Sequence, residues 1–578
     1  MTWTQVYDPF GAWWLSTLVA ALPVAVLLGL LAILRIKPHW AAMMGAATAL
    51  SAASLAFGMP WSLSSASLLY GVAFGLLKIA WIVIAAVFLY DISVHTGKFE
   101  IMKSSVAAIT ADRRLQALLV AFCFGALIEG AAGFGAPVAI AGAFMIGLGF
   151  KPFHAAALNL IANTAPVAWG AIGTPVHTLA AVSGLPEPQL NAMIGRILPF
   201  TAIIVPFWLV RAMVGWRETL EVLPAILVVG VSFAATQFVW SNFIDSNLVD
   251  IASGVVSLIT TIAFLRFWQP RRIWRFEDER ENEIAGAAAQ SDDAVRLRNA
   301  GQAATAPAPA PGRTVSQTLH TPGEVARAWS PFVILALFVL LWGLPPVKAA
   351  INHWTTPAFD RGGWDVPVLH KSVARAAPVA AQPTPEAAKF DFNWLSATGT
   401  GCFLAALASG LLLGVAPAHL LKIFWRTLVR MRFAVLAIAF MLGLGFVTRY
   451  SGMDAVLGLA FTRTGVLFPF FGTFLGWLGV ALTGSDTSSN ALFGGLQRIT
   501  AEQLNLSPVL MCAANSAGGV MGKMVDAQSI VVATAATNQV GNEGLIFRSV
   551  VWHSIALASI VGLIVMAYAY LFPGAIPH

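Results

Sequence analysis

Short polar or glycine-rich stretches interrupt the long apolar segments of this chain, and they hold the residues best suited to chemistry. The first runs from Gly125 to Pro137 and contains four glycines, a proline and Glu129. Glycine and proline both disfavour a regular helix, so this stretch predicts an unwound hairpin tip. A carboxylate in apolar surroundings is costly unless it is paired, hydrated or protonated. Glu129 therefore either caps backbone amides or takes up and releases a proton.

The second stretch, from Thr483 to Asn490, carries seven polar side chains in eight residues. Capping of a helix N-terminus explains one serine or aspartate, but it does not explain the whole run. Hydroxyl and amide groups supply neutral ligands, and free backbone N–H groups at a helix start attract a carboxylate. The pattern predicts a site for an ion or a small hydroxylated acid, with Asp486 as a second candidate proton carrier.

Two further polar breaks, at 162–176 and 513–530, predict broken helices. Asn163 and Thr164 offer amide and hydroxyl groups at the first break, and Asn515 and Ser516 offer them at the second. Lys523 either binds a substrate carboxylate or pairs permanently with a carboxylate of the chain, and both interpretations stay open. His177 and Asp526 are weaker candidates, because each can lie at a helix end in contact with water.

These stretches together define the predicted site. Glu129 and Asp486 are the predicted proton-coupling residues. The residues predicted to bind substrate are Gly133, Gly135, Asn163, Thr164, Ser485, Thr487, Ser488, Ser489, Asn515, Ser516 and Lys523.

Composition identifies the kind of molecule that must position these residues. Of the 578 residues, 58% are hydrophobic and only 11% are charged, and the mean hydropathy is +0.76. A soluble chain carries roughly a quarter charged residues, so a soluble enzyme, a disordered protein and a nucleic-acid binder are all excluded. The net charge of +7 is then a topology signal. The three cysteines lie in apolar stretches without the spacing of metal ligands or of a disulfide framework.

The apolar segments predict an all-α polytopic membrane protein. Residues 13–34 are long enough to cross the ~30 Å hydrocarbon core of a bilayer, and no Lys or Arg precedes them. We therefore expect a retained first helix with the N-terminus outside. The basic clusters fall on one side if 115–150 and 464–500 are re-entrant hairpins. This assumption predicts about 12 transmembrane helices plus two re-entrant hairpins, with both termini outside, and a plain count of about 14 helices stays open.

The polar segments divide the chain into two membrane halves, 1–276 and 329–578. Between them, residues 277–328 form an Ala- and Pro-rich polar linker that cannot build a core and is expected inside. Residues 351–392 are expected to form an external loop. Lys78 lies in the middle of an apolar run and is expected to face the protein interior.

The two halves share landmarks at nearly equal spacing, which predicts an internal repeat with cores at about 91–182 and 446–538. Thr96-Gly97, Gly130 and Asn163 in the first half match Ser451-Gly452, Gly484 and Asn515 in the second. Gly97 falls on the basic inside face and Gly452 falls outside, so the repeats run in opposite directions. Inverted repeats are typical of secondary transporters, which bind substrate where the repeats meet.

At these motifs the sequence resembles the L-lactate permease family of bacterial secondary transporters. The matching segments are CFGALIEGAAGFGAPVAI (123–140), GLGFKP (147–152), NTAPVAWGA (163–171), FLGWLGVALTGSDTSSNALF (474–493) and AANSAGGVMGKM (513–524). The likeness spans most of the chain, with the linker as the main exception. The chain departs from the family pattern at Lys78, at Thr174 to His177 and at Asp526-Ala527.

The resemblance implies uptake of L-lactate, and of D-lactate and glycolate, by proton symport across the bacterial inner membrane. With the topology expected from the basic residues, both termini are then periplasmic. The partners are then the acid, H⁺ and the lipid bilayer, without nucleic acid or any cofactor, and a homodimer is compatible with the sequence. The hairpin-plus-broken-helix repeat is similar, more loosely, to that of the broader ion transporter superfamily.

Three other functions stay open at this level. A Na⁺-coupled carboxylate transporter fits the asparagine-containing breaks and the hydroxyl-rich tip equally well. A passive monocarboxylate facilitator would need no coupling carboxylate. A membrane enzyme is the remotest, because no nucleophile, metal constellation or phosphate-binding glycine loop accompanies the two carboxylates.

Overall fold

The computed structural model describes most of the chain. The described residues are 2–32, 34, 36–107, 109–133, 136–276, 320–355, 363–380, 382–390, 392–537, 539 and 542–577. Most of the predicted linker, 277–319, and the predicted binding residue Gly135 therefore lie outside them. Helix α16 begins at Pro322, a few residues before the predicted end of that linker.

Fourteen α-helices are assigned before the linker. They are α1 (Trp13–Ala32), α2 (Pro38–Leu55), α3 (Trp61–Phe74), α4 (Trp81–His95), α5 (Lys98–Ala107), α6 (Arg113–Ala117), α7 (Gly125–Ala132), α8 (Ala136–Gly147), α9 (Pro152–Ala162), α10 (Gly170–Ser183), α11 (Glu187–Met213), α12 (Trp216–Glu221), α13 (Leu223–Phe243) and α14 (Val249–Leu265). Two π-helical segments and one 3₁₀ turn continue them: η1 (Gly75–Ala80), η2 (Leu118–Phe124) and η3 (Val167–Trp169).

The second half has a similar make-up. Its helices are α16 (Pro322–Gly343), α17 (Pro345–Thr355), α18 (Thr398–Leu412), α19 (Pro417–Ser451), α20 (Met453–Phe461), α21 (Phe468–Thr483), α22 (Asp486–Gln503), α23 (Pro508–Gly522), α24 (Ala527–Ala536) and α25 (Glu543–Tyr570), with 3₁₀ turns η4 (Thr462–Leu467) and η5 (Pro573–Ala575). The short strands are β1 (Trp3–Thr4), β2 (Trp364–Asp365), β3 (Val373–Arg375), β4 (Thr384–Pro385) and β5 (Lys389–Phe390).

Helix length and composition confirm a polytopic all-α membrane protein. Among the described residues, nine helices are long and apolar enough to cross a membrane, or ten if the bent pair α9 and η3–α10 forms one span. The predicted count of about 12 crossings stays a prediction. Length does not decide it, because α14 and α18 are apolar but only 17 and 15 residues long.

Each half of the chain contains a continuous helical segment of 35 residues that ends close to a glycine. In the first half it consists of α3, η1 and α4, and in the second half it is α19 alone. Gly97 (φ 70°) and Gly452 (φ 83°) follow these segments, in the left-handed backbone region that glycine adopts without steric cost. The two segments lie side by side, because α19 packs along α3 and η1.

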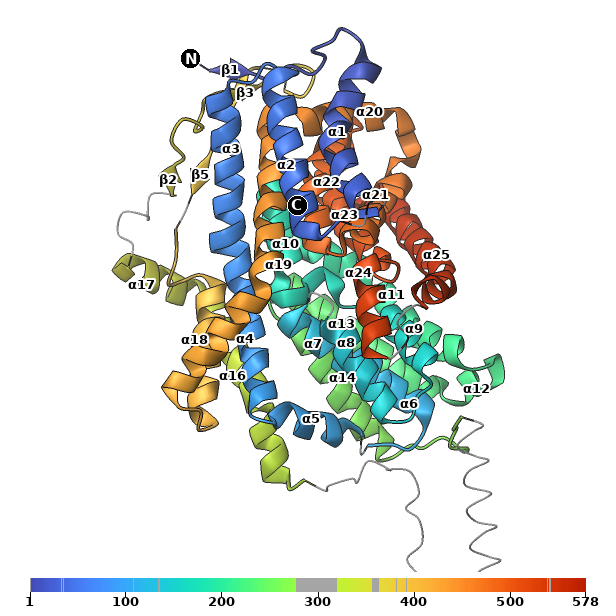
Figure 1. Cartoon of the computed structure of the whole chain (residues 1–578). Helices are drawn as coiled ribbons and strands as arrows, with labels where there is room; N and C mark the ends of the chain where they lie inside the picture. The colour runs from blue at the N-terminus through green and yellow to red at the C-terminus, as the bar shows by residue number, and fades with distance from the viewer. Residues whose placement is uncertain are drawn as a thin grey trace, which may run out of the picture.

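The same series of elements follows each glycine. A short helix (α5 or α20) leads into a half-helix that ends at a tip (α7 or α21), then into a second half-helix (α8 or α22) and a broken helix (α9–α10 or α23–α24). Figure 1 shows α5 at the lower end of the molecule and α20 at the upper end. The repeats therefore run in opposite directions, as predicted.

The structure corrects the register of the repeat at the first hairpin. The sequence spacing matched Gly130 with Gly484, but Gly130 lies inside α7. The residue that turns the chain is Gly133 (φ 58°), and its counterpart is Gly484 (φ 74°). The predicted unwinding over 125–137 was too wide, because α7 stays helical to Ala132 and α8 begins at Ala136. Gly125 and Gly130 lower the helix propensity of α7, but the tertiary packing of this fully buried helix overrides that cost.

The loop after α17 forms a small cap near the N-terminal end of the chain. Strand β3 pairs in parallel with β1 at the N-terminus and antiparallel with β4, while β2 pairs with β5. Strand β3 of the loop predicted at 351–392 therefore lies beside the N-terminus, at the top of the molecule in Figure 1, while β2 and β5 lie lower at the left of this view.

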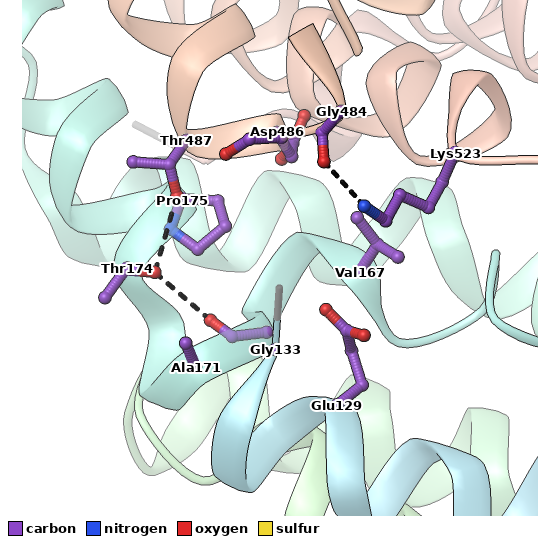
Figure 2. A pocket seen from close by; sticks show the side chains of 12 residues that line it. Glu129, Gly133, Val167, Ala171, Thr174, Pro175, Gly484, Asp486, Thr487 and Lys523 are labelled. Atoms are coloured by element: carbon purple, nitrogen blue, oxygen red, sulfur yellow. Dashed lines mark hydrogen bonds between the residues drawn. The ribbon is translucent and has the colours of Figure 1, made fainter. Parts of the chain in front are cut away.

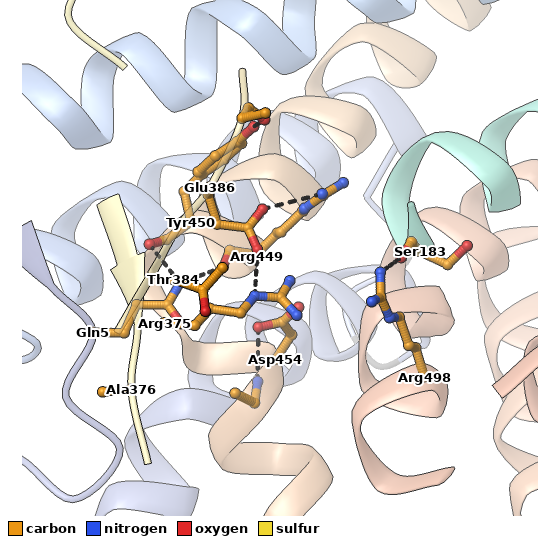
Figure 3. A network of polar contacts seen from close by, with 12 residues as sticks. Gln5, Ser183, Arg375, Ala376, Thr384, Glu386, Arg449, Tyr450, Asp454 and Arg498 are labelled. Atoms are coloured by element: carbon orange, nitrogen blue, oxygen red, sulfur yellow. Dashed lines mark hydrogen bonds and ion pairs between the residues drawn. The ribbon is translucent and has the colours of Figure 1, made fainter. Parts of the chain in front are cut away.

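A cluster of ion pairs binds this cap to α10 (Figure 3). Glu386 forms ion pairs with Arg375 and, at 3.2 Å, with Arg449. Burial alone would raise the pKa of the Glu386 carboxyl, but the two guanidinium charges outweigh burial and hold that pKa below its usual value. Arg449 also donates to the carbonyl of Ala181 at 2.9 Å, and Arg498 donates to that of Ser183 at 2.6 Å. Both cations thus lie at the C-terminal end of α10, where the helix dipole favours them.

Helices α21 and α23 are in backbone contact through glycines. A Cβ atom at Gly476 would overlap the carbonyl of Asn515, and one at Gly518 would overlap the carbonyl of Thr473. Small residues allow membrane helices to approach this closely. The contact fixes the half-helix that ends at the second tip against the helix that precedes Lys523.

We expect Gly518→Ala to destabilise the protein by about 1–3 kcal/mol, because overpacking a tight contact forces the backbones apart. The measurement is the thermal unfolding midpoint of the purified protein in detergent. Gly29→Ala is the matched control, since Gly29 lies inside α1 and a Cβ atom added there would have no neighbouring atom within 4 Å. Equal midpoints for the two variants would contradict the predicted close packing.

Candidate functional site

A small cavity lies where the two hairpin tips meet the broken helix α10. Its volume is about 30 Å³, which is room for about two water molecules. Figure 2 shows residues from both repeats facing one another across it. Its lining residues are Glu129, Gly133, Val167, Gly170, Ala171, Thr174, Pro175, Gly484, Ser485, Asp486, Thr487 and Lys523.

Glu129 enters the cavity from the last turn of α7. Its side chain is buried, with 3% exposure, and its Oε2 atom has no hydrogen-bond partner among the described residues. Gly170 packs directly against it, because a Cβ atom there would lie 2.5 Å from Glu129 Oε1. Any larger residue at position 170 would displace the carboxyl group.

Asp486 enters from the opposite tip, in the first turn of α22. Gly484 turns the chain, and Ser485 caps the helix by accepting the Ser488 N–H at 3.3 Å. Asp486 Oδ2 accepts hydrogen bonds from Ser516 Oγ at 2.5 Å and from Asn490 Nδ2 at 3.3 Å. Asp486 Oδ1 and Glu129 Oε2 both lack a hydrogen-bond partner among the described residues. What distinguishes Asp486 is that its Oδ2 atom accepts two side-chain hydrogen bonds.

The broken part of α10 closes the side of the cavity. Ala171, Ile172 and Gly173 all adopt positive φ, a costly conformation for the first two. After this break, Thr174 Oγ1 lies 3.4 Å from Thr487 Oγ1 of the other repeat (Figure 2). Only tertiary contacts that enclose the break on every side can hold such a backbone in place.

Lys523 supplies the positive charge of the cavity. Its Nζ donates to the carbonyl of Gly484 at 2.5 Å and forms an ion pair with Asp526 Oδ2 at 3.3 Å. Its charge also acts on Glu129 and on Asp486. Both sequence interpretations thus retain support, because Lys523 is paired with Asp526 and still lines the cavity.

The predicted binding residues fall into two groups. Gly133, Ser485, Thr487 and Lys523 line the cavity together with Glu129 and Asp486. Six others lie outside its lining: Asn163, Thr164, Ser488, Ser489, Asn515 and Ser516.

Several of this second group bond elsewhere. Thr164 donates to the Ile161 carbonyl, Ser489 to the Gly476 carbonyl, and Asn515 to Asn490 Oδ1. Asn163 differs, because it lies near Glu129 while neither of its amide atoms has a hydrogen-bond partner among the described residues. It is a buried polar group immediately behind the cavity.

The second broken helix differs from its prediction. Asn515 and Ser516 lie inside the continuous helix α23, and the break begins only at Lys523 and ends at Asp526, which caps α24. The prediction placed Asn515 and Ser516 at a break because the sequence around Asn515 resembles the sequence around Asn163. The helix before the second break is longer, since α23 has 15 residues and α9 has 11. Ser516 still belongs to the site as a donor to Asp486.

Sequence reasoning missed half of the cavity lining. The missed residues are Val167, Gly170, Ala171, Thr174, Pro175 and Gly484. Thr174 and Pro175 do carry a signal, which is a polar break with a proline within an apolar helix. Val167 and Ala171 carry no such signal, since an apolar residue in a membrane segment is usually packing.

Two other polar residues singled out in the sequence, His177 and Lys78, are not part of the cavity lining. His177 contacts Glu187 Oε2 at 2.9 Å and Asn247 Oδ1 at 3.0 Å. Lys78 is half-buried and donates to Asn393 Oδ1 at 2.5 Å. In the part of the chain that the structure describes, no group of three or more His, Cys, Asp or Glu residues could hold a metal ion.

Two inverted repeats with hairpin tips and broken helices around one buried cavity define a multi-pass membrane protein with the architecture of secondary transporters. The sequence model of the L-lactate permease family matches residues 16–572. The chain belongs to this family.

Curated relatives match the chain over nearly its whole length. It is 47% identical to the glycolate permease GlcA of Escherichia coli K12, with 99% of each chain covered. It is 46% identical to the L-lactate permease of the same strain and 40% identical to that of Bacillus subtilis 168, with all of each chain covered.

The contact between Thr174 and Thr487 across the repeats is directly testable. We expect the pair Thr174→Cys and Thr487→Cys to form a disulfide on mild oxidation, because the two side-chain oxygens are 3.4 Å apart. The native cysteines 123, 402 and 512 are buried and leave a low background. Mass spectrometry of the digested protein gives the cross-linked fraction.

The control pair combines Thr174→Cys with Ser489→Cys, whose native hydroxyl donates to Gly476 on the far side of the tip. The arrangement of the tips is wrong if both pairs cross-link equally.

Proposed function

We propose that this protein is a secondary active transporter that takes up L-lactate, D-lactate and glycolate across the bacterial inner membrane by proton symport. Its relatives are named L-lactate permease and glycolate permease, and both of these acids are small 2-hydroxy monocarboxylates. The proposed protein is a permease without enzymatic activity or cofactor, and its N- and C-termini are periplasmic.

The cavity lining carries this proposal, because it combines one cation, one helix start and two carboxyl groups. A lactate carboxylate placed there would meet the Lys523 ammonium group and the free N–H groups at the start of α22. Charge-assisted hydrogen bonds of this kind are the strong ones. The hydroxyls of Thr174, Ser485 and Thr487 are available for the 2-hydroxyl group of the acid.

Transport requires the two tips to separate. A cavity with room for about two water molecules is too small for an acid with six non-hydrogen atoms such as lactate. The Thr174–Thr487 contact and the hydrogen bond from Asn490 to the Pro175 carbonyl join the two repeats, and they must lengthen first. The site is therefore too narrow for lactate in this conformation, and the contacts across it must open before substrate binds.

Glu129 is the first choice for the coupling proton and Asp486 the second. Glu129 faces the cavity, and its Oε2 lacks a partner among the described residues, so a proton or a substrate hydroxyl can occupy that position. Asp486 already accepts two hydrogen bonds, from Ser516 and Asn490. Uptake of one lactate anion with one proton moves no net charge, which lowers the cost of crossing a low-dielectric interior.

The decisive experiment is uptake of labelled L-lactate into proteoliposomes with an inward proton gradient and no sodium. We expect wild-type protein to concentrate lactate until a protonophore is added, and Glu129→Gln to abolish this accumulation because it cannot carry the proton. Glu100→Gln is the matched control, since that carboxylate is 72% exposed on α5. Uptake that requires sodium would contradict proton symport in favour of a Na⁺-coupled transporter. Uptake that only equilibrates lactate across the membrane would contradict it in favour of a passive facilitator.

The role of Lys523 in binding has its own test. We expect Lys523→Met combined with Asp526→Asn to raise the KM for lactate by about tenfold to a hundredfold, because a charge-assisted hydrogen bond contributes roughly 1.5–3 kcal/mol. The second substitution prevents a buried carboxylate from losing its ion pair, and Asn still caps α24. Asp526→Asn alone is the control. An unchanged KM in the double variant would assign Lys523 to a permanent ion pair only.

A further inference from the structure

Asp250 is a buried acid that has no role in the transport cycle proposed above. It lies in the first turn of α14 and is 0% exposed. Neither carboxylate oxygen has a hydrogen-bond partner among the described residues. An unpaired charge buried in this way costs several kcal/mol or more, so the group is held as a neutral acid in this conformation.

Asp250 faces the helix that carries Glu129. A Cβ atom at Gly130 would lie 2.8 Å from Asp250 Cβ, and one at Gly254 would lie 3.0 Å from the backbone nitrogen of Leu127. Gly254 is one helical turn after Asp250, so this whole face of α14 packs against α7 at close range. Asp250 therefore lies behind the cavity, directly beside the residue that follows Glu129.

The titratable groups around Asp250 come from few elements. Glu129 of α7 acts on it electrostatically, and η2 contributes the thiol of Cys123, which contacts Ser257. Helix α13 carries no titratable residue. The loop before α14 adds Asp245, and through Asn247 it reaches the His177–Glu187 pair of α10 and α11.

We propose that Asp250 is a second proton-carrying residue of the transport cycle, which exchanges a proton with Glu129. In this step the O–H bond of Asp250 breaks as the O–H bond of Glu129 forms. Because neither Asp250 oxygen has a hydrogen-bond partner among the described residues in this conformation, the proton passes through a bridging water molecule or after the two carboxyl groups have moved into hydrogen-bonding distance. Glu129 and Asp250 are both buried and act on each other electrostatically. Two such acids readily share one proton, because both cannot be charged cheaply at once. Asp250 holds the proton behind the cavity while Glu129 is in contact with substrate.

This inference rests on the proposed proton symport. It is tested with Asp250→Asn in proteoliposomes by two measurements: lactate accumulation driven by a proton gradient, and exchange of lactate for lactate at equal pH on both sides. Exchange needs no net proton transfer. We expect accumulation to fall at least about tenfold while exchange is retained.

Ser253→Ala is the matched control, since Ser253 is buried on the same helix and its hydroxyl bonds only to the Val249 carbonyl. Accumulation by Asp250→Asn at the wild-type level would overturn the inference, and so would loss of exchange together with accumulation in a folded protein.

If Asp250→Asn does not fold, Asp250→Glu takes its place. For Asp250→Glu, a pH profile of uptake that is shifted from the wild-type profile, with lactate exchange intact, supports the inference. A profile equal to that of the wild type overturns it. Failure of the wild-type protein to use a proton gradient would instead refute the proposed function.

Discussion

Polar groups in the middle of this protein are out of reach of bulk water, and lipid offers them no hydrogen bonds. Each broken helix and each hairpin tip exposes backbone N–H and C=O groups that must be satisfied inside the protein. The two repeats meet this requirement by enclosing each other's irregular segments. Asn490 of the second repeat donates to the carbonyl of Pro175 in the first. Within the second repeat, Lys523 donates to the carbonyl of Gly484 at the tip. The cavity thus forms where side chains and backbone groups provide the hydrogen bonds that the broken helices and tips require.

The same constraint explains where glycine is used. Gly133 and Gly484 turn the chain at the tips with positive φ, while Gly170, Gly476 and Gly518 allow backbone or a carboxyl group to approach closely. In a membrane, helices gain little from hydrophobic burial against each other, so close packing and interhelical hydrogen bonds must hold them. Glycine at these contacts therefore contributes both to stability and to the geometry of the site.

The cap beside the N-terminus connects with this centre through α10. Arg449 and Arg498 hold the carbonyls at the C-terminal end of that helix, and Glu386 from the cap binds Arg449. Thr174, near the other end of α10, lines the cavity. Any movement of α10 during transport therefore changes the contacts of the cap, so α10 couples the cap to the site.

The sequence by itself determined the polytopic helical fold, the inverted repeat and the identity of the two charged tips, because apolar segments and polar interruptions are local features that a membrane makes conspicuous. Tertiary structure alone decided which residues meet. It placed Gly133 rather than Gly130 at the turn, kept Asn515 inside α23, and brought Val167 and Ala171 to the cavity. It also set Asp250 behind Glu129. These positions depend on helix lengths and on contacts between segments more than a hundred residues apart, and no local pattern records such contacts.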